Sequence, residues 1–331
     1  MSQFCSAGAR VIGRFVCAFS LVGLVADSAS AQTFPSRPIR VVLGFPPGTT
    51  PDVLMRALGE RMAEDVRHPV VVDNRPGAAG IVASETVARA PADGYTLLVD
   101  GCSAAGMVYS FVMAGRRPFD PFKDFTPVGR IMRDHWIVVA SPALNVSTLD
   151  ELIAIGKSGK VALHYPSVGI GSSGHLQSER FRMRAGIEAT HVPYKDSYTP
   201  DLLAGRVAFA VQTTPPVVPL VRTGKLNGLA VLSTARLAAL PAVPTTAEAG
   251  LPDLTYNAGV CLYAPGGTPR PAITRLNAAL NKAAASDAVA KRYADLGVEP
   301  VQASPEDTAK FIRELMALVD DLRLRIFGKA R

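Results

Sequence analysis

The sequence predicts an α/β fold, and three features of the chain lead to that prediction. Short β-branched runs alternate with longer segments in which apolar residues recur at helical spacing. Loops rich in glycine and proline join the end of a short run to the start of a longer segment. The chain is also long enough for two domains. Strands that alternate with helices favour a parallel sheet, with ligand loops at the carboxyl ends of the strands.

The first strand–loop–helix unit shows this alternation most clearly. Ile39–Leu43 predicts a buried strand, and residues 44–51 cannot continue it because they include three prolines and two glycines. Residues 52–66 then follow helical spacing. Three side chains can cap the first turn: Thr49, Thr50 and Asp52. Such a helix start suits an anion, although a strand-to-helix connection without a ligand fits the same spacing.

The later elements follow in the same manner. Strands or extended segments are expected at 68–74, 95–99, 126–133, 136–140, 161–165, 190–194, 207–212, 229–233 and 260–264. Helices are expected at 81–89, 148–156, from about 175 to 184, and at 200–204, 217–223, 271–286, 288–296 and 305–326. Ser147–Asp150 resembles a capping box, and Ser304 is expected to cap the last helix.

The first 31 residues have the pattern of a secretory signal peptide. Arg10 and Arg14 precede an apolar core at 15–26, and Ala29–Ala31 reads as an A-x-A cleavage site. The core is about a dozen residues, too few to span a bilayer, which favours a cleaved signal over a membrane anchor. Removing 31 of the 331 residues leaves 300. We therefore expect a soluble, exported protein.

The charge of the chain suits an anionic ligand. The whole sequence carries +7, and the first 31 residues hold two arginines and one aspartate, so the mature chain carries +6. A dense Lys/Arg run of the kind that binds nucleic acid does not occur in the sequence. Cys5 and Cys17 leave with the signal. Cys102 and Cys261 can then either pair or remain as free, buried thiols.

Residues Gly169–Gly174 match the dinucleotide pattern GxGxxG between an expected strand and an expected helix. Asp196, just after the next strand, stands where an acidic residue holds the ribose in such proteins. An exported protein rarely meets NAD, however. The plainer interpretation is a second anion-accepting helix start, with Ser172 and Ser173 as additional donors. The nucleotide-dependent enzyme stays open as the alternative from another class.

Other catalytic or metal patterns do not occur in the sequence. The nucleophile pattern GxSxG is absent, because His175 stands at its second glycine. The five histidines show neither HExxH nor metal-ligand spacing, and we expect structural or surface roles for them: His68, His135, His164, His175 and His191. These patterns therefore give no reason to expect catalysis or a metal site.

Eight segments, in order along the mature chain, resemble one family closely. They lie at 38–48, 71–78, 92–98, 120–125, 171–176, 191–195, 240–245 and 264–269. The chain is similar to the Bug family, the periplasmic solute-binding receptors of tripartite tricarboxylate transporters. That resemblance implies a two-lobed periplasmic-binding-protein fold, type II-like, that closes on a small carboxylate like a flytrap. Residues 32–134 and 258–331 would form lobe 1, and residues 135–257 would form lobe 2.

The resemblance also implies a site and partners. The ligand would lie between the lobes, against nine residues: Phe45, Thr49, Thr50, Cys102, Ser103, Ser172, Ser173, Gln212 and Thr213. The receptor would be a monomer that delivers its ligand to the membrane subunits of a transporter, or, as the alternative, presents it to a sensor. Two crossings, near 133–136 and 257–260, would act as the hinge.

Several positions depart from the family pattern. A glycine is replaced by Thr49, asparagines by Ile81 and Ile170, another glycine by Asp196, and an aspartate by Ala208. If the two isoleucines line the site, they remove partners for a polar ligand and favour an aliphatic or aromatic carboxylate over amino acids or citrate. If they point into the core, this expectation fails.

Overall fold

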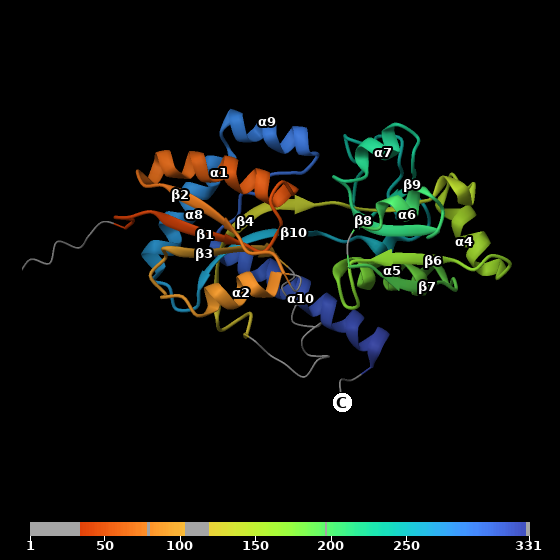
Figure 1. Cartoon of the computed structure of the whole chain (residues 1–331), viewed down its shortest axis with the longest axis horizontal. Helices are drawn as coiled ribbons and strands as arrows, with labels where there is room; N and C mark the ends of the chain where they lie inside the picture. The colour runs from red at the N-terminus through yellow and green to blue at the C-terminus, as the bar shows by residue number, and fades with distance from the viewer. Residues whose placement is uncertain (1–33, 78–79, 103–118, 196, 329–331) are drawn as a thin grey trace, which may run out of the picture. The chain divides into compact units, whose positions relative to one another are not determined.

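The computed structural model describes residues 34–77, 80–102, 119–195 and 197–328. The predicted signal peptide, Ser103 and Asp196 therefore lie outside the described residues. The structure is a mixed α/β fold in which sheets are covered by helices (Figure 1). Within the described ranges, no helix has both the length and the apolar character needed to cross a membrane.

The larger sheet has five strands in the order β2–β1–β3–β10–β4. These strands are β1 (Ile39–Leu43), β2 (Val70–Asn74), β3 (Thr96–Gly101), β4 (Phe125–Asp134) and β10 (Ala258–Pro265). β2, β1 and β3 pair in parallel, as predicted, whereas β10 runs antiparallel to both β3 and β4. The strand from the end of the chain therefore completes a sheet begun at its start.

Helices cover both faces of this sheet because its strands are apolar on both faces. Val41 and Leu43 point to a core shared with α1 (Thr50–Val66), α8 (Arg270–Ala284) and α9 (Asp287–Leu296). Val42 points to the other core, shared with α2 (Ile81–Ala88) and α10 (Pro305–Phe327). Figure 1 shows α1 and α9 on one side of the sheet and α2 on the other.

The remaining strands form two smaller sheets. β5 (Trp136–Ala140) lies between β8 (Phe209–Thr213) and β9 (Asn227–Val231), and β6 (His164–Ser167) pairs with β7 (Thr190–Pro193). The prediction of parallel pairing is correct for β6 and β7 but wrong for β5, which is antiparallel to both neighbours. The helices here are α4 (Leu149–Ser158), α5 (Ser173–Ala185), α6 (Thr199–Leu203) and α7 (Val218–Arg222), with short 3-10 turns at Pro142–Leu144 and Pro252–Leu254.

The C-terminal helix α10 contacts both the larger sheet and a helix that packs beside the smaller sheets. It packs against β4 and also against α5, and its residues Ile312 and Met316 share a core with Leu176 and Phe181 of α5. The last helix therefore does not pack on the larger sheet alone. The division at residues 134/135 and 257/258 into two lobes stays a prediction.

The helix caps explain two boundaries. Ser304 accepts the backbone N–H of Asp307 at 3.0 Å, which confirms the predicted cap of α10. The capping box of α4 is shifted by one residue from the predicted Ser147–Asp150. It joins Thr148 and Glu151, each of which accepts the backbone N–H of the other at 3.2 Å.

Candidate functional site

The loop between β1 and α1 is fixed by Asp52, which is 3% exposed. Its Oδ2 accepts the Gly48 N–H at 2.8 Å, and its Oδ1 accepts from Asn74 Nδ2 at 2.9 Å and from Arg56 Nε at 3.0 Å. Burial works against ionisation, but these donors outweigh it and hold the pKa of Asp52 below its usual value. Asn74 also donates to the Phe45 carbonyl at 3.1 Å, which ties the end of β2 to this loop.

The predicted ligand residues of this loop have mainly structural contacts. Thr49 is the N-cap residue of α1, but its hydroxyl donates back to the Pro46 carbonyl at 2.7 Å and does not cap. Phe45 packs against the core beneath α1. Thr50 begins the helix and is half-buried. Of the three predicted capping side chains, only Asp52 accepts a backbone N–H of the loop.

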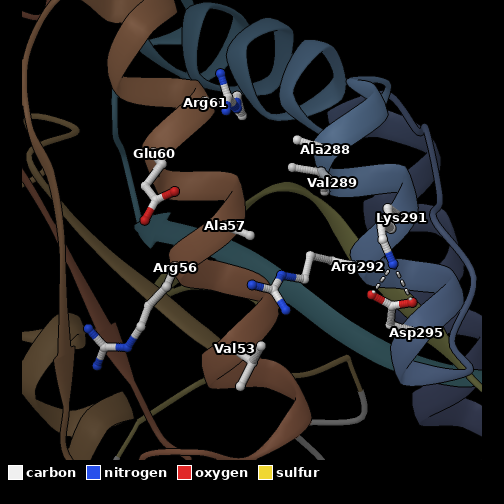
Figure 2. Close-up of a pocket in the computed structure, with 10 residues that line it drawn as sticks. All are labelled: Val53, Arg56, Ala57, Glu60, Arg61, Ala288, Val289, Lys291, Arg292 and Asp295. Carbon is white, nitrogen blue, oxygen red and sulfur yellow. Dashed lines mark hydrogen bonds and ion pairs between the residues drawn. The ribbon is translucent and has the colours of Figure 1, made fainter.

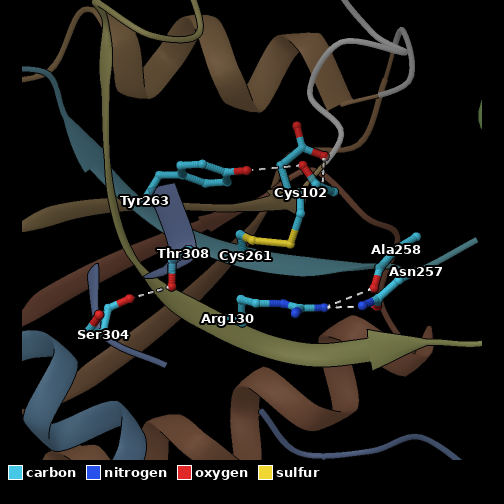
Figure 3. Close-up of a disulfide and its surroundings, with 10 residues drawn as sticks. Cys102, Arg130, Asn257, Ala258, Cys261, Tyr263, Ser304 and Thr308 are labelled. Atoms are coloured by element: carbon cyan, nitrogen blue, oxygen red, sulfur yellow. Dashed lines mark hydrogen bonds between the residues drawn. A yellow bond between two sulfur atoms is a disulfide. The ribbon is translucent and has the colours of Figure 1, made fainter. Parts of the chain in front are cut away.

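The end of β3 carries a disulfide. Cys102 and Cys261 are bonded, which settles the alternative that the sequence left open (Figure 3). Cys102 is 0% exposed as a whole residue, so the prediction that it contacts the ligand is not supported. The Cys102 N–H donates to the Gly259 carbonyl at 2.8 Å, and Tyr263 donates to the Gly101 carbonyl at 3.3 Å.

Asp100 lies in β3, two residues before Cys102, and its side chain is buried. Among the described residues, none of its hydrogen-bond partners is a cation. It accepts the Gly101 N–H at 2.7 Å and the Ser84 hydroxyl at 3.0 Å. Burial raises the pKa of Asp100 to about 7 against the smaller effect of these two donors.

The start of α5 is the second predicted helix start, and it lies at Ser173, two residues before the expected position of about 175. Ser172 is the N-cap residue and accepts the His175 N–H at 3.3 Å. The Gly171 N–H donates to His175 Nδ1 at 3.0 Å. A Cβ at Gly174 would lie 3.6 Å from the Val211 carbonyl oxygen, which places this first turn against β8.

The end of β8 separates two predicted wall residues. The side-chain Oε1 of Gln212 accepts from the Tyr198 hydroxyl at 3.1 Å, next to α6, whereas Val211 faces the α5 side. Side chains alternate along a strand, so Thr213 shares the face of Val211 and Gln212 does not. Of the two, Thr213 is therefore the one on the side of the α5 start.

A groove of about 680 Å³ lies elsewhere, between α1 and α9 (Figure 2). Its described lining contains none of the nine predicted site residues. Four of its six charged residues are paired: Lys291 with Asp295 at 3.0 Å, Arg61 with Glu64 at 2.7 Å, and Arg56 with Asp52 at 3.0 Å. Among the described residues, no group of three or more His, Cys, Asp or Glu side chains is placed to hold a metal ion.

The comparisons with known proteins identify the family. The family described as "Tripartite tricarboxylate transporter family receptor" matches residues 54–322. Protein BugT of Bordetella pertussis is 36% identical over 306 residues, which cover 92% of each chain. The chain belongs to this receptor family. The Bug resemblance is thus confirmed, and the family is one of solute-binding receptors.

Several solved structures share the fold of this chain. A structure described as a periplasmic transporter aligns at a TM-score of 0.79 with 32% identity, over 90% of this chain and 100% of that one. A protein of R. palustris solved with adipate aligns at 0.76 with 32% identity, over 88% and 97%. MatC from Rhodopseudomonas palustris, with bound malate, aligns at 0.75 with 29% identity, over 87% and 99%.

The structure also separates the two isoleucines of the receptor. Ile81 is 3% exposed and belongs to the core around α2, so the prediction that it lines the ligand is wrong. Ile170 is 56% exposed in the loop before α5. Three residues hold these loops through side-chain hydrogen bonds that were not predicted from the sequence. They are Asn74, His175 and Asp52, of which Asp52 was expected only as a helix cap. Their common signal is a polar side chain within a turn of a glycine-rich loop.

Proposed function

We propose that this chain is a periplasmic receptor that captures a small organic carboxylate and delivers it to the membrane subunits of a transporter, without catalysis. One observation carries the proposal: the loops before α1 and α5 are each held by an internal hydrogen bond, from Gly48 to Asp52 and from Gly171 to His175. A helix start whose loop is already fixed can bind an anion through its backbone N–H groups with little reorganisation.

Two relatives support the choice of ligand class. The structures with adipate and with malate belong to proteins at 32% and 29% identity that span nearly the same length. Both molecules are dicarboxylates, which suits a site with two anion-accepting helix starts. The predicted ligand residues that remain compatible with a site are the loop at 45–50, Ser172, Ser173 and Thr213. Cys102 is fully buried and Gln212 lies on the other face of β8, so neither is retained.

A ligand panel tests the proposal directly. Thermal and chemical unfolding of the mature chain should be followed with adipate, malate, benzoate, glutamate, citrate and NAD. A ligand present at a hundred times its dissociation constant stabilises by about 2.7 kcal/mol. We expect stabilisation by at least one carboxylate and recovery of that carboxylate unchanged after incubation. Stabilisation by NAD alone, or conversion of the ligand, would contradict the receptor assignment.

Export is the second part of the proposal. Arg10, Arg14, the apolar core at 15–26 and the Ala29–Ala31 site indicate cleavage before Gln32. Intact-mass measurement of periplasmic protein should show a chain that begins at residue 32. Size-exclusion chromatography should show that this chain is a monomer. Uncleaved protein in the cytoplasm would rule out the periplasmic role.

A further inference from the structure

The loops before α1 and α5 share one local geometry. Gly48 and Gly171 each have φ of 79°, a left-handed conformation that favours glycine, and each precedes the N-cap residue of its helix. In each loop the glycine N–H donates to a side chain four residues later, in the first helical turn. The acceptor is Asp52 Oδ2 at 2.8 Å in one loop and His175 Nδ1 at 3.0 Å in the other.

The two acceptors respond differently to acid. Asp52 keeps a pKa below its usual value, so it remains an acceptor throughout the neutral and mildly acidic range. His175 accepts only while Nδ1 carries no proton, which requires the neutral ring with its proton on Nε2. Protonation would convert this acceptor into a donor that faces the donor N–H of Gly171.

The surroundings of His175 favour the neutral ring. Its imidazole stacks on that of His191, with ring centroids 3.9 Å apart and planes 16° apart. Tyr165 and Phe327 lie at centroid distances of 6.3 and 5.5 Å. Burial, followed by repulsion from His191, lowers the pKa of His175 to about 4.

The same histidine pair holds the other end of the loop. His191 Nε2 lies 2.7 Å from the Ser167 hydroxyl oxygen. That hydroxyl lies 2.9 Å from the Gly169 carbonyl oxygen, and it accepts the Gly169 N–H at 3.2 Å. The stacked rings therefore fix both Gly169 and Gly171, on either side of the exposed Ile170.

Few charges oppose this arrangement. Among the described residues, the titratable side chains around His175 come from β6, β7 and α5, and they are Tyr165, His191, Glu179 and Arg182. Glu179 favours protonation of His175, but its charge is shared with Arg182 at 2.9 Å and with the Tyr165 hydroxyl. From α10 the ring of Phe327 faces His175, and the charged residues before it pair within the helix as Asp320–Arg323 and Asp321–Arg325.

We propose that neutral His175 is the positioning residue that holds the loop at 168–172 in its ligand-binding form, and that protonation of this ring releases the loop and weakens carboxylate binding. The inference rests on the proposed function, since it assigns the regulation of that same site. It makes the α5 loop acid-sensitive and leaves the α1 loop, with its carboxylate acceptor, unaffected.

The first test uses the ligand-free wild-type chain and needs no variant to fold. Nitrogen-15 NMR should show the His175 ring protonated at Nε2 at pH about 7.5. On titration to pH about 4, the Gly171 amide signal should move together with the His175 ring, while the Gly48 amide signal stays in place. A ring protonated at Nδ1, or a Gly171 signal that does not follow His175, overturns the proposal.

The second test uses two substitutions that place an acceptor differently. In His175→Asn the side-chain oxygen occupies the place of Nδ1, whereas in His175→Gln the amide reaches the place of Nε2. Affinity for the carboxylate found in the panel should fall about tenfold more in the Gln variant than in the Asn variant, because Gly171 then loses its acceptor. His68→Asn, on the segment between α1 and β2, is the control and should bind like wild type.

The pH profile separates positioning from simple packing. Below pH about 5, wild-type affinity should fall more steeply than that of His175→Asn, because the asparagine cannot be protonated. Protonation of the ligand itself affects both proteins equally. Equal profiles overturn the proposal. If no carboxylate binds at all, the proposed function fails, while the NMR titration still decides the role of His175.

Discussion

Asp52 joins three parts of the first loop at the residue scale. Its two oxygens accept from Gly48 before the helix, from Arg56 within it and from Asn74 at the end of β2. A buried carboxylate with this many donors is stabilising only while all of them remain. Its removal leaves the Gly48 N–H and the Asn74 amide without this acceptor.

We predict that Asp52→Ala lowers the free energy of unfolding by about 1 to 3 kcal/mol, because the substitution removes three hydrogen bonds to a buried carboxylate that hold the loop. Chemical denaturation of the mature chain measures the change. The matched control is Asp295→Ala on α9, whose ion pair with Lys291 is largely exposed and should change stability by less than about 1 kcal/mol. Equal effects of the two substitutions would show that the Asp52 network is not stabilising.

Asp100 gives a pH prediction of opposite sign to that of a paired carboxylate. Its folded-state pKa of about 7 exceeds the usual 3.8, so the folded chain binds a proton that the unfolded chain has released. The contribution of protonated Asp100 to the free energy of unfolding is fully present below about pH 4 and is lost as pH rises to about 7. Asp100→Asn keeps the shape and cannot ionise. Its stability relative to wild type should rise between pH 4 and 8 by up to about 4 kcal/mol, and a constant difference would contradict burial of the charge.

The expectation of an apolar ligand now rests on Ile170 alone, because Ile81 lies in the core. An exposed isoleucine gains about 25 cal/mol for each Å² that a ligand covers. We predict that Ile170→Asn lowers the ratio of adipate to glutamate affinity about fivefold, measured by calorimetry. Ile81→Val should leave this ratio unchanged. If Ile170→Asn also leaves it unchanged, Ile170 does not touch the ligand.

At the element scale, local patterns predicted which segments are strands and helices. β1 matches its predicted residues because a β-branched run ends at a loop with three prolines, and α10 begins where Ser304 caps it. Pairing partners were not predictable in this way. β5 pairs antiparallel with β8 and β9, two strands that come much later in the chain. Spacing within a segment carries no information on such contacts.

The same limit applied to the site. Ser172 and Ser173 were placed correctly at the start of α5, because helix starts have local signatures. The separation of Gln212 from Thr213 depends on the register and facing of β8, which sequence alone left undefined. The disulfide was left open because its cysteines are 159 residues apart and only the pairing of β3 with β10 brings them together.

This disulfide should matter for the larger sheet. It joins β3, a strand of the first hundred residues, to β10, which enters the sheet from the end of the chain. A crosslink that closes so long a loop restricts the unfolded chain, and its removal typically costs 2 to 5 kcal/mol. We predict a loss of about this size for Cys261→Ala in oxidising buffer. In reducing buffer, wild type and variant should unfold with similar free energies.

At the scale of the whole molecule, two crossings connect the larger sheet with the smaller ones. β4 passes into β5 through His135 alone, and the chain returns through Asn257 into β10. The two crossings lie side by side, since Ala258 pairs with Asp134. Arg130 Nη2 donates to the Asn257 side chain at 3.3 Å and to the Ala258 carbonyl at 3.2 Å, as Figure 3 shows. These bonds tie the two crossings together on the β4 side.

Two adjacent, tied crossings restrict relative motion of the proposed lobes to a hinge. We predict that a saturating carboxylate reduces the radius of gyration measured by small-angle scattering, because in the proposed site the ligand contacts both helix starts at once. A panel member that does not bind is the control and should leave the radius unchanged. Arg130→Lys keeps a cation but loses the planar donor set that reaches Asn257 and Ala258, so it should weaken the coupling between crossings and lower the affinity. A radius that stays constant at saturation would mean that capture does not use closure.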